Sequence, residues 1–400
     1  MVNILSKNKM YRFSQSKIIL YRDIETFTQL VADEFNFESV NVYWRGECPQ
    51  TTEKVVVRAI SPDVVIASSL WRSFSFIDLF AGIGGIRLGF ESVGGRCVFS
   101  SEFDVDAQKT YQANFDDKPF GDITKIATAD IPNHDILLAG FPCQPFSIIG
   151  KQQGFTDTRG TLFFEIERII RDKKPTAFLL ENVKQFRTHD NGRTCQIVLD
   201  RLRELGYYTY ITVLNAIDFG VAQKRERTII VGFSEPLTFH FPEPYPYRPL
   251  LQDVLEKDSD VDKKLFASDM ICKKRLARLK EQGQSPFYPS MWHENKGGHI
   301  GIHPFSCALR HNASYNYLLV NGNRRATGRE MLRFQGLPES FKIPVNHSAI
   351  RAQAGNSVAV PVITAVAAEM MLALRNRKIL NSPITAVKQH SLFETLYRSR

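Results

Sequence analysis

The sequence has few cysteines, no closely spaced cysteine pair and no hydrophobic run long enough to cross a membrane. Its six cysteines are scattered over 400 residues without Cys-x-x-Cys spacing, which argues against a zinc site or a thioredoxin-like centre. No apolar run reaches the roughly 18 residues that a membrane helix needs, and the N-terminus has no small-residue cleavage site. We therefore expect no signal peptide, no metal site and no membrane partner, and free thiols in a reducing cytoplasm.

The chain also lacks internal repeats and any excess of acidic residues. Hydrophobic residues make up 43% and charged residues 23%, as in ordinary soluble proteins, and 400 residues allow two or three domains. The formal net charge of +9 is compatible with a polyanionic partner such as nucleic acid. A basic protein without such a partner fits the charge equally well.

Strands and helices alternate from Phe74 to about residue 234. Six apolar segments predict strands, with helices between most of them: "FSFIDLF", "RCVFSSEF", "HDILLAGFP", "TAFLLENV", "YYTYITVLNA" and "RTIIVGF". Alternation of this kind predicts an α/β catalytic domain over 73–234, built on a parallel sheet that is covered on both faces.

The remaining segments follow other patterns. Residues 1–72 predict a small α+β extension of unknown role, with a helix in "YRDIETFTQLVADEFNF" and two short strands in "KVVVRAI" and "DVVIASSL". Residues 235–325 are proline-rich and irregular, include the basic stretch "KKRLARLK", and are loop-like at "MWHENKGGHIGIHPF". Helical character resumes over 326–380, and residues 381–400 predict a basic tail.

A glycine-rich turn follows the first predicted strand, in "FIDLFAGIGG". Gly82 and Gly84 stand at the mouth of a helix, where they let a ligand approach the backbone and where the helix N-terminus favours negative charge. Arg87 occupies the position of the third glycine in a complete Gly-x-Gly-x-x-Gly. The turn alone therefore does not distinguish a ligand site from a plain tight turn.

Two carboxylates support a nucleoside pocket beside this turn. Glu102 ends the second predicted strand 20 residues after Gly82, where an acidic residue commonly holds ribose hydroxyls. Asp122, in "GDI", lies near the end of the next predicted strand. Either acid alone would fit a solvated surface, but both at strand ends indicate a cofactor, either a dinucleotide or S-adenosylmethionine.

Cys143 lies in "GFPCQPFS", directly after a strand and on the side where open α/β sheets bind their ligands. Pro142 and the proline at 145 fix the backbone on both sides of the thiol. The neighbouring Gln144 and Ser147 argue against burial in a core. A reachable cysteine of this kind is suited to act as a thiolate nucleophile.

Charged residues end two further segments of the predicted sheet. "FLLENV" places Glu181 and Asn182 at the end of an apolar strand, where partial desolvation raises the pKa of an acid and suits it to donate a proton. Arg225 and Arg227, in "QKRER", are two residues apart before a strand, so we expect both to point the same way, toward carbonyl or phosphate oxygens. Surface charge alone would also explain the arginines.

Together these blocks resemble the DNA (cytosine-5)-methyltransferase family of bacterial restriction-modification type. Their order is "FIDLFAGIGG", "SSEFD", "GDI", "GFPCQPFS", "LLENV", "QKRER", "GREMLRFQGLP" and "QAGNSVAVPV". The resemblance covers about residues 74–375, with an unmatched stretch at about 235–300, where members of this family carry target recognition. It implies a Rossmann-like S-adenosylmethionine-dependent methyltransferase fold with a smaller, irregular target-recognition domain over 235–325.

The resemblance also implies roles for individual residues. Cys143 is the nucleophile, Glu181 binds the N3 edge of the target cytosine, Arg227 bonds the ring carbonyl, and Arg225 supports the loop. Residues implied in substrate binding are Gln144, Ser147 and Asn182. The implied S-adenosylmethionine site comprises Phe80, Gly82, Gly84, Glu102, Asp122, Pro142, Asn356 and Ser357.

The implied reaction methylates C5 of a flipped cytosine in a short duplex DNA site, through a covalent bond between Cys143 and C6. The resemblance further implies a monomer in the bacterial cytoplasm, at the nucleoid, that is paired with a restriction endonuclease. The helix in "VAVPVITAVAAEMMLAL" is expected to return beside the first strand and close the catalytic domain.

Three alternatives fit parts of the sequence. A tRNA-methylating branch shares the blocks, but its Cys-Phe-Thr signature is missing from the recognition stretch. A non-catalytic methyltransferase-like DNA-binding protein would have no chemical need for Cys143, Glu181 and Arg227 together. The absent third glycine and the Pro-Cys loop disfavour a nicotinamide dehydrogenase.

Overall fold

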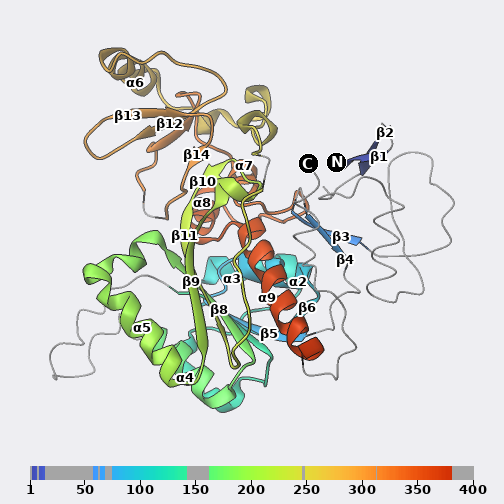
Figure 1. Ribbon diagram of the computed structural model, residues 1–400. Helices are drawn as coiled ribbons and strands as arrows, with labels where there is room; N and C mark the ends of the chain where they lie inside the picture. Colours follow the sequence, from blue (N-terminus) through green and yellow to red (C-terminus); the bar gives the residue numbers. More distant parts are fainter. Residues whose placement is uncertain are drawn as a thin grey trace, which may run out of the picture.

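The computed structural model describes residues 2–6, 9–13, 57–61, 64–67, 74–141, 162–245, 248–311 and 313–380 (Figure 1). The helix predicted in "YRDIETFTQLVADEFNF", the cysteine loop from Pro142 onward and the tail 381–400 lie outside these residues. Two short antiparallel pairs belong to the N-terminal part: β1 (Val2–Ser6) with β2 (Lys9–Phe13), and β3 (Val57–Ser61) with β4 (Val64–Ala67). The second pair confirms the two strands predicted there.

A six-stranded sheet has the order β6-β5-β7-β8-β11-β9. Its strands are β5 (Phe74–Leu79), β6 (Gly95–Ser101), β7 (Ile136–Gly140), β8 (Ala177–Val183), β9 (Tyr208–Asn215) and β11 (Glu226–Phe233). The strands β5 to β8 are parallel, as predicted from the alternation of strands and helices. Their carboxyl ends therefore meet at one edge of the sheet.

The prediction of a wholly parallel sheet is wrong for β11, which pairs antiparallel with both β8 and β9. Only residues 216–225 join β9 to β11. A parallel connection needs a crossover of about a dozen residues or more, usually a helix. Because this connection is shorter, the chain reverses direction and β11 inserts between its neighbours.

Helices cover both faces of the sheet (Figure 1). One face packs on α2 (Gly85–Ser92) and α9 (Val360–Leu380), and the other on α4 (Leu162–Lys173) and α5 (Arg193–Glu204). Successive strand residues point to opposite faces, so Phe76 joins the first cluster and Ile77 the second. Burial on both faces explains why these strands are apolar throughout.

The C-terminal helix α9 packs beside α2, as expected for a segment that closes the domain. Gly89 of α2 makes this contact close, since a Cβ there would lie 2.6 Å from Cγ2 of Ile363. The expectation that no apolar run is long enough to cross a membrane is wrong by composition, because the stretch His347–Leu374 is long and apolar enough to do so. However, 83% of its most apolar window is buried inside the protein, which is the pattern of a core helix.

A second, three-stranded sheet lies apart from the first and includes part of the region predicted to be loop-like (Figure 1). It contains β12 (Met291–Glu294), β13 (Ile300–His303) and β15 (Leu318–Val320), and α6 (Asp269–Glu281) packs on it. The loop prediction for "MWHENKGGHIGIHPF" is therefore wrong. The glycines form the turn of a hairpin, where Gly298 has φ of 78°. The histidines in the two strands obscured the alternation of polar and apolar residues that would have predicted them.

Short elements join this second sheet to the first. β10 (Gln223–Lys224) pairs in parallel with β14 (Ser306–Cys307) just before β11 begins. Helices α7 (Gly328–Phe334) and α8 (His347–Asn356) follow the second sheet, and α3 (Val105–Phe115) follows β6. Thr327 and Glu330 form a capping box at the start of α7, which agrees with the resumed helical character predicted there.

The close contact between α2 and α9 generates a stability prediction. We expect Gly89→Ala to lower the free energy of unfolding by about 1–3 kcal/mol, because the added methyl group overpacks a buried contact with Ile363. Thermal and urea unfolding of the purified protein measure the effect. The control is Gly297→Ala, whose Cβ would meet only Oδ1 of Asn295, at 3.4 Å, and should change stability by less than about 0.5 kcal/mol. Equal stabilities of the two variants would contradict the packing argument.

Candidate active site

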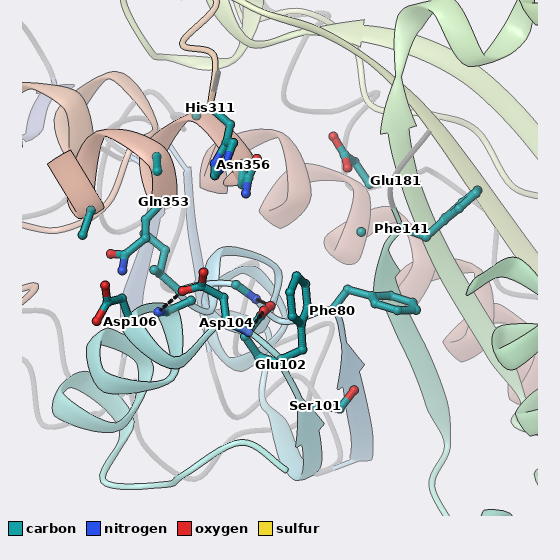
Figure 2. Close-up of a pocket in the computed structure, with 18 of the residues that line it drawn as sticks. Phe80, Ser101, Glu102, Asp104, Asp106, Phe141, Glu181, His311, Gln353 and Asn356 are labelled. Carbon is teal, nitrogen blue, oxygen red and sulfur yellow. Dashed lines mark hydrogen bonds between the residues drawn. The ribbon is translucent and has the colours of Figure 1, made fainter. Parts of the chain in front are cut away.

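A cavity of about 820 Å³ opens at the carboxyl ends of β5, β6, β7 and β8. Open α/β sheets bind their ligands at this edge. Figure 2 shows Phe80 and Glu102 on one side of the cavity, with Glu181 and Asn356 farther round its wall. The sequence-predicted residues that line it are Phe80, Gly82, Glu102, Asp122, Glu181, Asn182, Arg225, Arg227 and Asn356.

The glycine turn after β5 shapes the first end of the cavity. Phe80 has φ of 57°, a left-handed conformation that costs a non-glycine residue about 1–3 kcal/mol. Gly82 has φ of 56°, and nothing lies within 4 Å of the place where its Cβ would be, so a ligand has room to approach the backbone. Gly84 does not line the cavity and instead packs against the ring of Phe115, as the N-cap of α2.

Glu102 directly follows β6 and is fixed by two backbone donors. Its Oε2 accepts from the N–H of Gly82 at 2.8 Å, and its Oε1 accepts from the N–H of Asp104 at 2.8 Å. Burial raises the pKa of the Glu102 carboxyl, although these backbone donors oppose the shift. The carboxylate thus links the glycine turn to the end of the second strand, and each oxygen retains capacity to accept from a ligand hydroxyl.

Asp122 lies in the cavity wall. The sequence predicted it near the end of a strand, but it does not end a regular strand. It is the N-cap of the 3₁₀ helix Ile123–Lys125, and its Oδ1 accepts from the N–H of Thr124 at 3.0 Å. Ser357 also differs from expectation, because it does not line the cavity. Its backbone carbonyl points toward Arg225 instead.

Several residues of this first end were missed from sequence, and Phe103 and Gln353 are two with side chains suited to bind a ligand. Phe103 lines the cavity with 75% of its surface exposed, and its position beside Glu102 at a strand end was the available signal. Gln353 of α8 is buried, and while its Oε1 accepts from Oγ1 of Thr110, its Nε2 has no partner in the described part of the chain. An exposed ring and an unused donor in one wall suit a planar ligand that carries acceptors.

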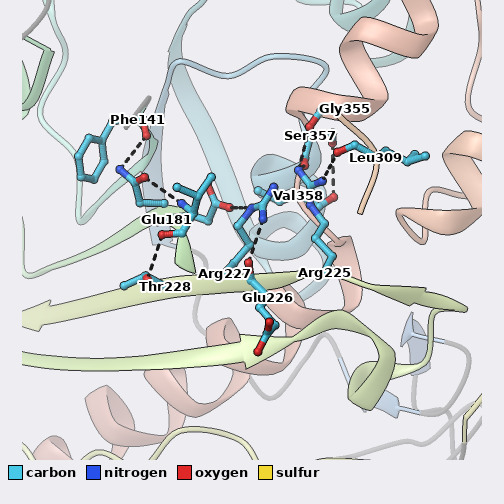
Figure 3. Close-up of polar contacts among 12 residues, drawn as sticks. Phe141, Glu181, Arg225, Glu226, Arg227, Thr228, Leu309, Gly355, Ser357 and Val358 are labelled. Atoms are coloured by element: carbon cyan, nitrogen blue, oxygen red, sulfur yellow. Dashed lines mark hydrogen bonds and ion pairs between the residues drawn. The ribbon is translucent and has the colours of Figure 1, made fainter. Parts of the chain in front are cut away.

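The second end of the cavity is built around Glu181, at the carboxyl end of β8 (Figure 3). Glu181 is 8% exposed, and its Oε1 lies 2.8 Å from Nε of Arg227 on the neighbouring strand β11. Burial raises the pKa of Glu181, and the guanidinium groups of Arg227 and Arg225 partly oppose the shift. A carboxyl with a raised pKa keeps its proton to higher pH than a solvated acid does, as a proton donor requires.

Asn182 fixes the strand end where the cysteine loop begins. Its Nδ2 donates to the carbonyl of Phe141 at 3.0 Å, and its Oδ1 accepts from the N–H of Val183 at 2.8 Å. Phe141 itself lines the cavity and is the last described residue before the loop. The predicted residues Pro142, Cys143, Gln144 and Ser147 lie outside the described residues.

Arg225 and Arg227 both line the cavity, but Arg227 pairs with Glu181 whereas Arg225 donates to backbone carbonyls. Arg225 is 2% exposed and donates to the backbone carbonyls of Leu309, Gly355 and Ser357 (Figure 3). It thus ties the segment between β14 and β15, and the end of α8, to the start of β11 in the first sheet. No group of three or more His, Cys, Asp or Glu side chains with metal-site geometry occurs among the described residues.

The residues that form the described fold and site match a known protein family. Residues 74–372 match the family model for C-5 cytosine-specific DNA methylases. The chain is 60% identical over 293 residues to the Type II methyltransferase M.NgoBI of Neisseria gonorrhoeae, covering 73% of this chain and 91% of that protein. It is 56% identical over 310 residues to M.HaeII of Haemophilus aegyptius, another Type II methyltransferase, covering 77% and 96%.

Solved structures with the same fold are more distant in sequence. A DNMT2 mutant from Spodoptera frugiperda superposes with a TM-score of 0.59 at 19% identity, covering 75% of this chain and 99% of that one. A putative prophage DNA modification methyltransferase from E. coli superposes with a TM-score of 0.56 at 21% identity, covering 76% and 99%. At these identities the likeness establishes the shared α/β fold.

The contacts of Arg225 generate the second prediction. Arg225→Met should lower the free energy of unfolding by about 2–4 kcal/mol, because three backbone carbonyls lose their charged donor inside the protein. The matched control is Arg193→Met, which removes an arginine with 73% of its side chain exposed and should cost at most about 1 kcal/mol. Urea unfolding monitored by circular dichroism measures both. Similar losses for the two variants would show that the buried contacts add little.

Proposed function

This chain belongs to the C-5 cytosine-specific DNA methylase family and is a DNA (cytosine-5)-methyltransferase, and from that premise we propose how its residues carry out the reaction. The methyl donor is S-adenosylmethionine, the substrate is a cytosine flipped out of a short duplex site, and Cys143 forms a transient covalent bond to the base. One observation supports this most directly. A single cavity contains both Glu102 with the glycine turn and Glu181 with Arg227.

The first end of the cavity fits the nucleoside part of S-adenosylmethionine. The Glu102 carboxylate would accept from ribose hydroxyls, and the exposed ring of Phe103 would stack on the adenine. Open space at Gly82 admits the ligand close to the backbone, and Phe80, Asp122 and Asn356 complete the wall. When bound, this cofactor supplies an electrophilic methyl group on a sulfonium.

The second end of the cavity fits a cytosine ring. Arg227 would donate to the ring carbonyl, and Glu181 would hold a proton at N3. Addition of the Cys143 thiolate to C6 then makes C5 nucleophilic, because the proton from Glu181 at N3 neutralises the developing negative charge. After methylation, loss of the C5 proton to a base and β-elimination break the bond between sulfur and C6 and restore the thiolate.

A stacked base pair cannot enter a cavity walled by buried side chains, so the cytosine must leave the duplex, which costs a few kcal/mol (roughly) in unstacking. Residues 235–325, which include the second sheet, are proposed to hold the flanking duplex. Both named relatives are Type II methyltransferases. The proposed setting is accordingly a restriction-modification system in a bacterial cytoplasm, where a monomeric enzyme protects DNA from a partner endonuclease.

The covalent mechanism leads to a direct test. Labelled methyl transfer from S-adenosylmethionine to unmethylated duplex DNA should be abolished in Cys143→Ala and reduced about 10²- to 10⁴-fold in kcat in Glu181→Gln, which cannot donate an acid proton. A duplex with 5-fluorocytosine should trap the wild-type enzyme in a denaturation-resistant complex, because fluorine at C5 prevents β-elimination. Cys143→Ala should form no such complex.

The control is Cys272→Ala, which removes a half-buried thiol on α6 and should retain activity within roughly twofold of wild type. Transfer that persists in Cys143→Ala would refute covalent catalysis by this residue. Label that enters bulk tRNA and not DNA would show that the substrate is RNA. Binding of S-adenosylmethionine without transfer to either would favour a non-catalytic DNA-binding protein.

The cofactor end gives a separate prediction. Phe103→Ala should weaken S-adenosylmethionine binding about 5- to 150-fold, since stacking of a base on an aromatic ring is worth about 1–3 kcal/mol. Stability should change little, because the ring is 75% exposed. Isothermal titration calorimetry measures the Kd. Phe120→Ala is the matched control, since that ring is 58% exposed but stacks on Phe99 outside the cavity lining, and equal weakening in both variants would contradict the assignment.

A further inference from the structure

The six-stranded sheet ends in two edges, β6 and β9, which differ in how they are protected. At the β6 edge, the N–H of Phe120 donates to the carbonyl of Ser100 at 2.8 Å, and the carbonyl of Phe120 accepts from the N–H of Glu102 at 2.8 Å. β6 also carries the exposed Arg96 and a shift in its register with β5. A charge and an irregularity at an edge disfavour pairing with another chain, so the β6 edge is closed.

The β9 edge has none of these protective features. Its sequence, "YTYITVLN", contains no charged residue and no proline. Its register with β11 is regular from end to end, without a bulge. Six of its 8 residues are aromatic or β-branched, the types most enriched in strands. A long, regular and uncharged edge of this kind is suited to pair with a further strand.

The hydrogen bonds around β9 show which of its backbone groups point outward. The N–H of Ala216 donates to the carbonyl of Arg225 at 2.9 Å, and hydrogen-bonded pairs alternate along an antiparallel ladder. Counted back from that pair along the register, the even-numbered residues of β9 bond to β11. The residues between them therefore direct their N–H and C=O groups away from the sheet: Thr209, Ile211, Val213 and Asn215.

No described part of the chain supplies a backbone partner to these outward groups. The side chain of Ile211 packs on the cluster that contains α5, and the hydroxyl of Tyr210 donates to the carbonyl of Leu237. These neighbours lie on the two faces of β9 and leave its edge open. Every residue of β9 is at least partly exposed, and Tyr208 is 49% exposed. The outward groups are therefore accessible to a partner.

A second copy of β9 is complementary to this edge. The outward residues are symmetric about Thr212, so a twofold axis at Thr212, perpendicular to the sheet, pairs two copies of β9 antiparallel. Thr209 then lies opposite Asn215 of the second copy, and Ile211 lies opposite Val213 of the second copy. Residues opposite each other in this way exchange N–H···O=C bonds, so outward donors meet outward acceptors.

The side chains that this register brings together are also compatible. On the face toward α5, Ile211 meets Val213 of the second copy. On the face toward α9, Tyr210 meets Leu214 of the second copy, and Thr212 meets its own counterpart. Apolar, aromatic and Thr–Thr pairs stabilise antiparallel strands, and no like charges meet. The symmetry of the strand supplies all of these pairs at once, which an unrelated peptide would not.

We propose that the β9 edge, defined as the outward backbone groups of Thr209, Ile211, Val213 and Asn215, is a surface through which two copies of this chain join their sheets into one. Because the β6 edge is closed, association stops at a dimer. A contact limited to one strand edge is small beside the roughly 1,200 Å² at which stable interfaces begin, so we expect a Kd of about 1–100 μM. At the nanomolar concentrations of an enzyme assay the chain is then the monomer proposed above.

The dimer leaves the catalytic cavity intact. The cavity lies at the carboxyl ends of β5 to β8, and its lining residues all come from one chain. β9 runs parallel to β8, because β11 is antiparallel to both. The twofold axis reverses strand direction, so the two cavities open at opposite ends of the joined sheet and cannot hold one ligand together. The inference therefore goes beyond the proposed function and does not rest on it.

Analytical ultracentrifugation of the full chain from about 1 to 200 μM tests this surface, and wild type should pass from monomer to dimer over that range. Thr212→Lys and Thr212→Glu should each raise the Kd about 5- to 30-fold, because the Thr–Thr pair is lost and like charges meet across the axis. An equimolar mixture of the two variants should regain the dimer, which misfolded chains would not do. Gln284→Lys, exposed beyond α6, is the control and should leave the Kd unchanged.

Thr212→Cys gives a second readout of the same register. Opposite residues of a non-hydrogen-bonded antiparallel pair have Cα atoms about 4.5 Å apart, which is within disulfide range. Mild oxidation should therefore link Thr212→Cys to its own counterpart in a covalent dimer. Wild type, treated alike, shows what its six native cysteines form and should yield no such dimer in comparable amount.

Three results would overturn this proposal: a wild type that stays monomeric throughout, a dimer that both charged variants retain, or a mixture of them that does not associate. In the first case an extended peptide from another protein is the remaining occupant of the edge. Methyl transfer per chain at nanomolar concentration should agree within about twofold between wild type and Thr212→Lys. Loss of transfer in both, with the wild-type dimer intact, would refute the proposed function and leave the interface standing.

Discussion

The guanidinium group of Arg225 is buried where three segments of the chain meet, and the site depends on its hydrogen bonds. A buried cation is stabilised by hydrogen bonds from its donors, and here Nη1 and Nη2 donate to the backbone carbonyls of Leu309, Gly355 and Ser357, while Nε has no partner among the described residues. Those carbonyls belong to the segment between β14 and β15 and to the end of α8. One side chain thereby fixes the cavity wall formed by His311 and Asn356 relative to the strand that carries Arg227.

Polar contacts at strand ends also hold the residues at each end of the cavity. Glu181 lies between Arg227, with which it pairs, and the loop start at Phe141, which Asn182 holds through a hydrogen bond. Glu102 holds the glycine turn in a comparable way at the other end. Each of these two carboxylates is thus positioned by backbone or arginine contacts at a strand end, and the sheet sets the distance between the two. Placement at strand ends would give the proposed site the preorganisation that catalysis requires.

Sequence reasoning succeeded where the pattern was local and failed where distant segments meet. The strand ends at Glu102 and Glu181 follow from apolar runs that stop at a polar residue, and both acids do line one cavity. The reversed direction of β11 was missed because strand direction depends on connection length and sheet order, which periodicity does not reveal. Gln353 and His311 were missed because they reach the cavity from a helix and a loop far along the chain, and Phe103 was missed although it follows Glu102 at a strand end.

The packing of α9 on α2 also constrains when the enzyme becomes active during its synthesis. Gly89 and Ile363 are in contact although 274 residues separate them (363 minus 89). Until α9 has left the ribosome, the face of the sheet that carries Phe76 and Leu138 lacks its main cover and stays exposed. The strands that hold Glu102 and Glu181 are made early, but their final packing waits for the end of the chain. A chain that still lacks α9 would therefore present Glu102 and Glu181 on an unfinished core.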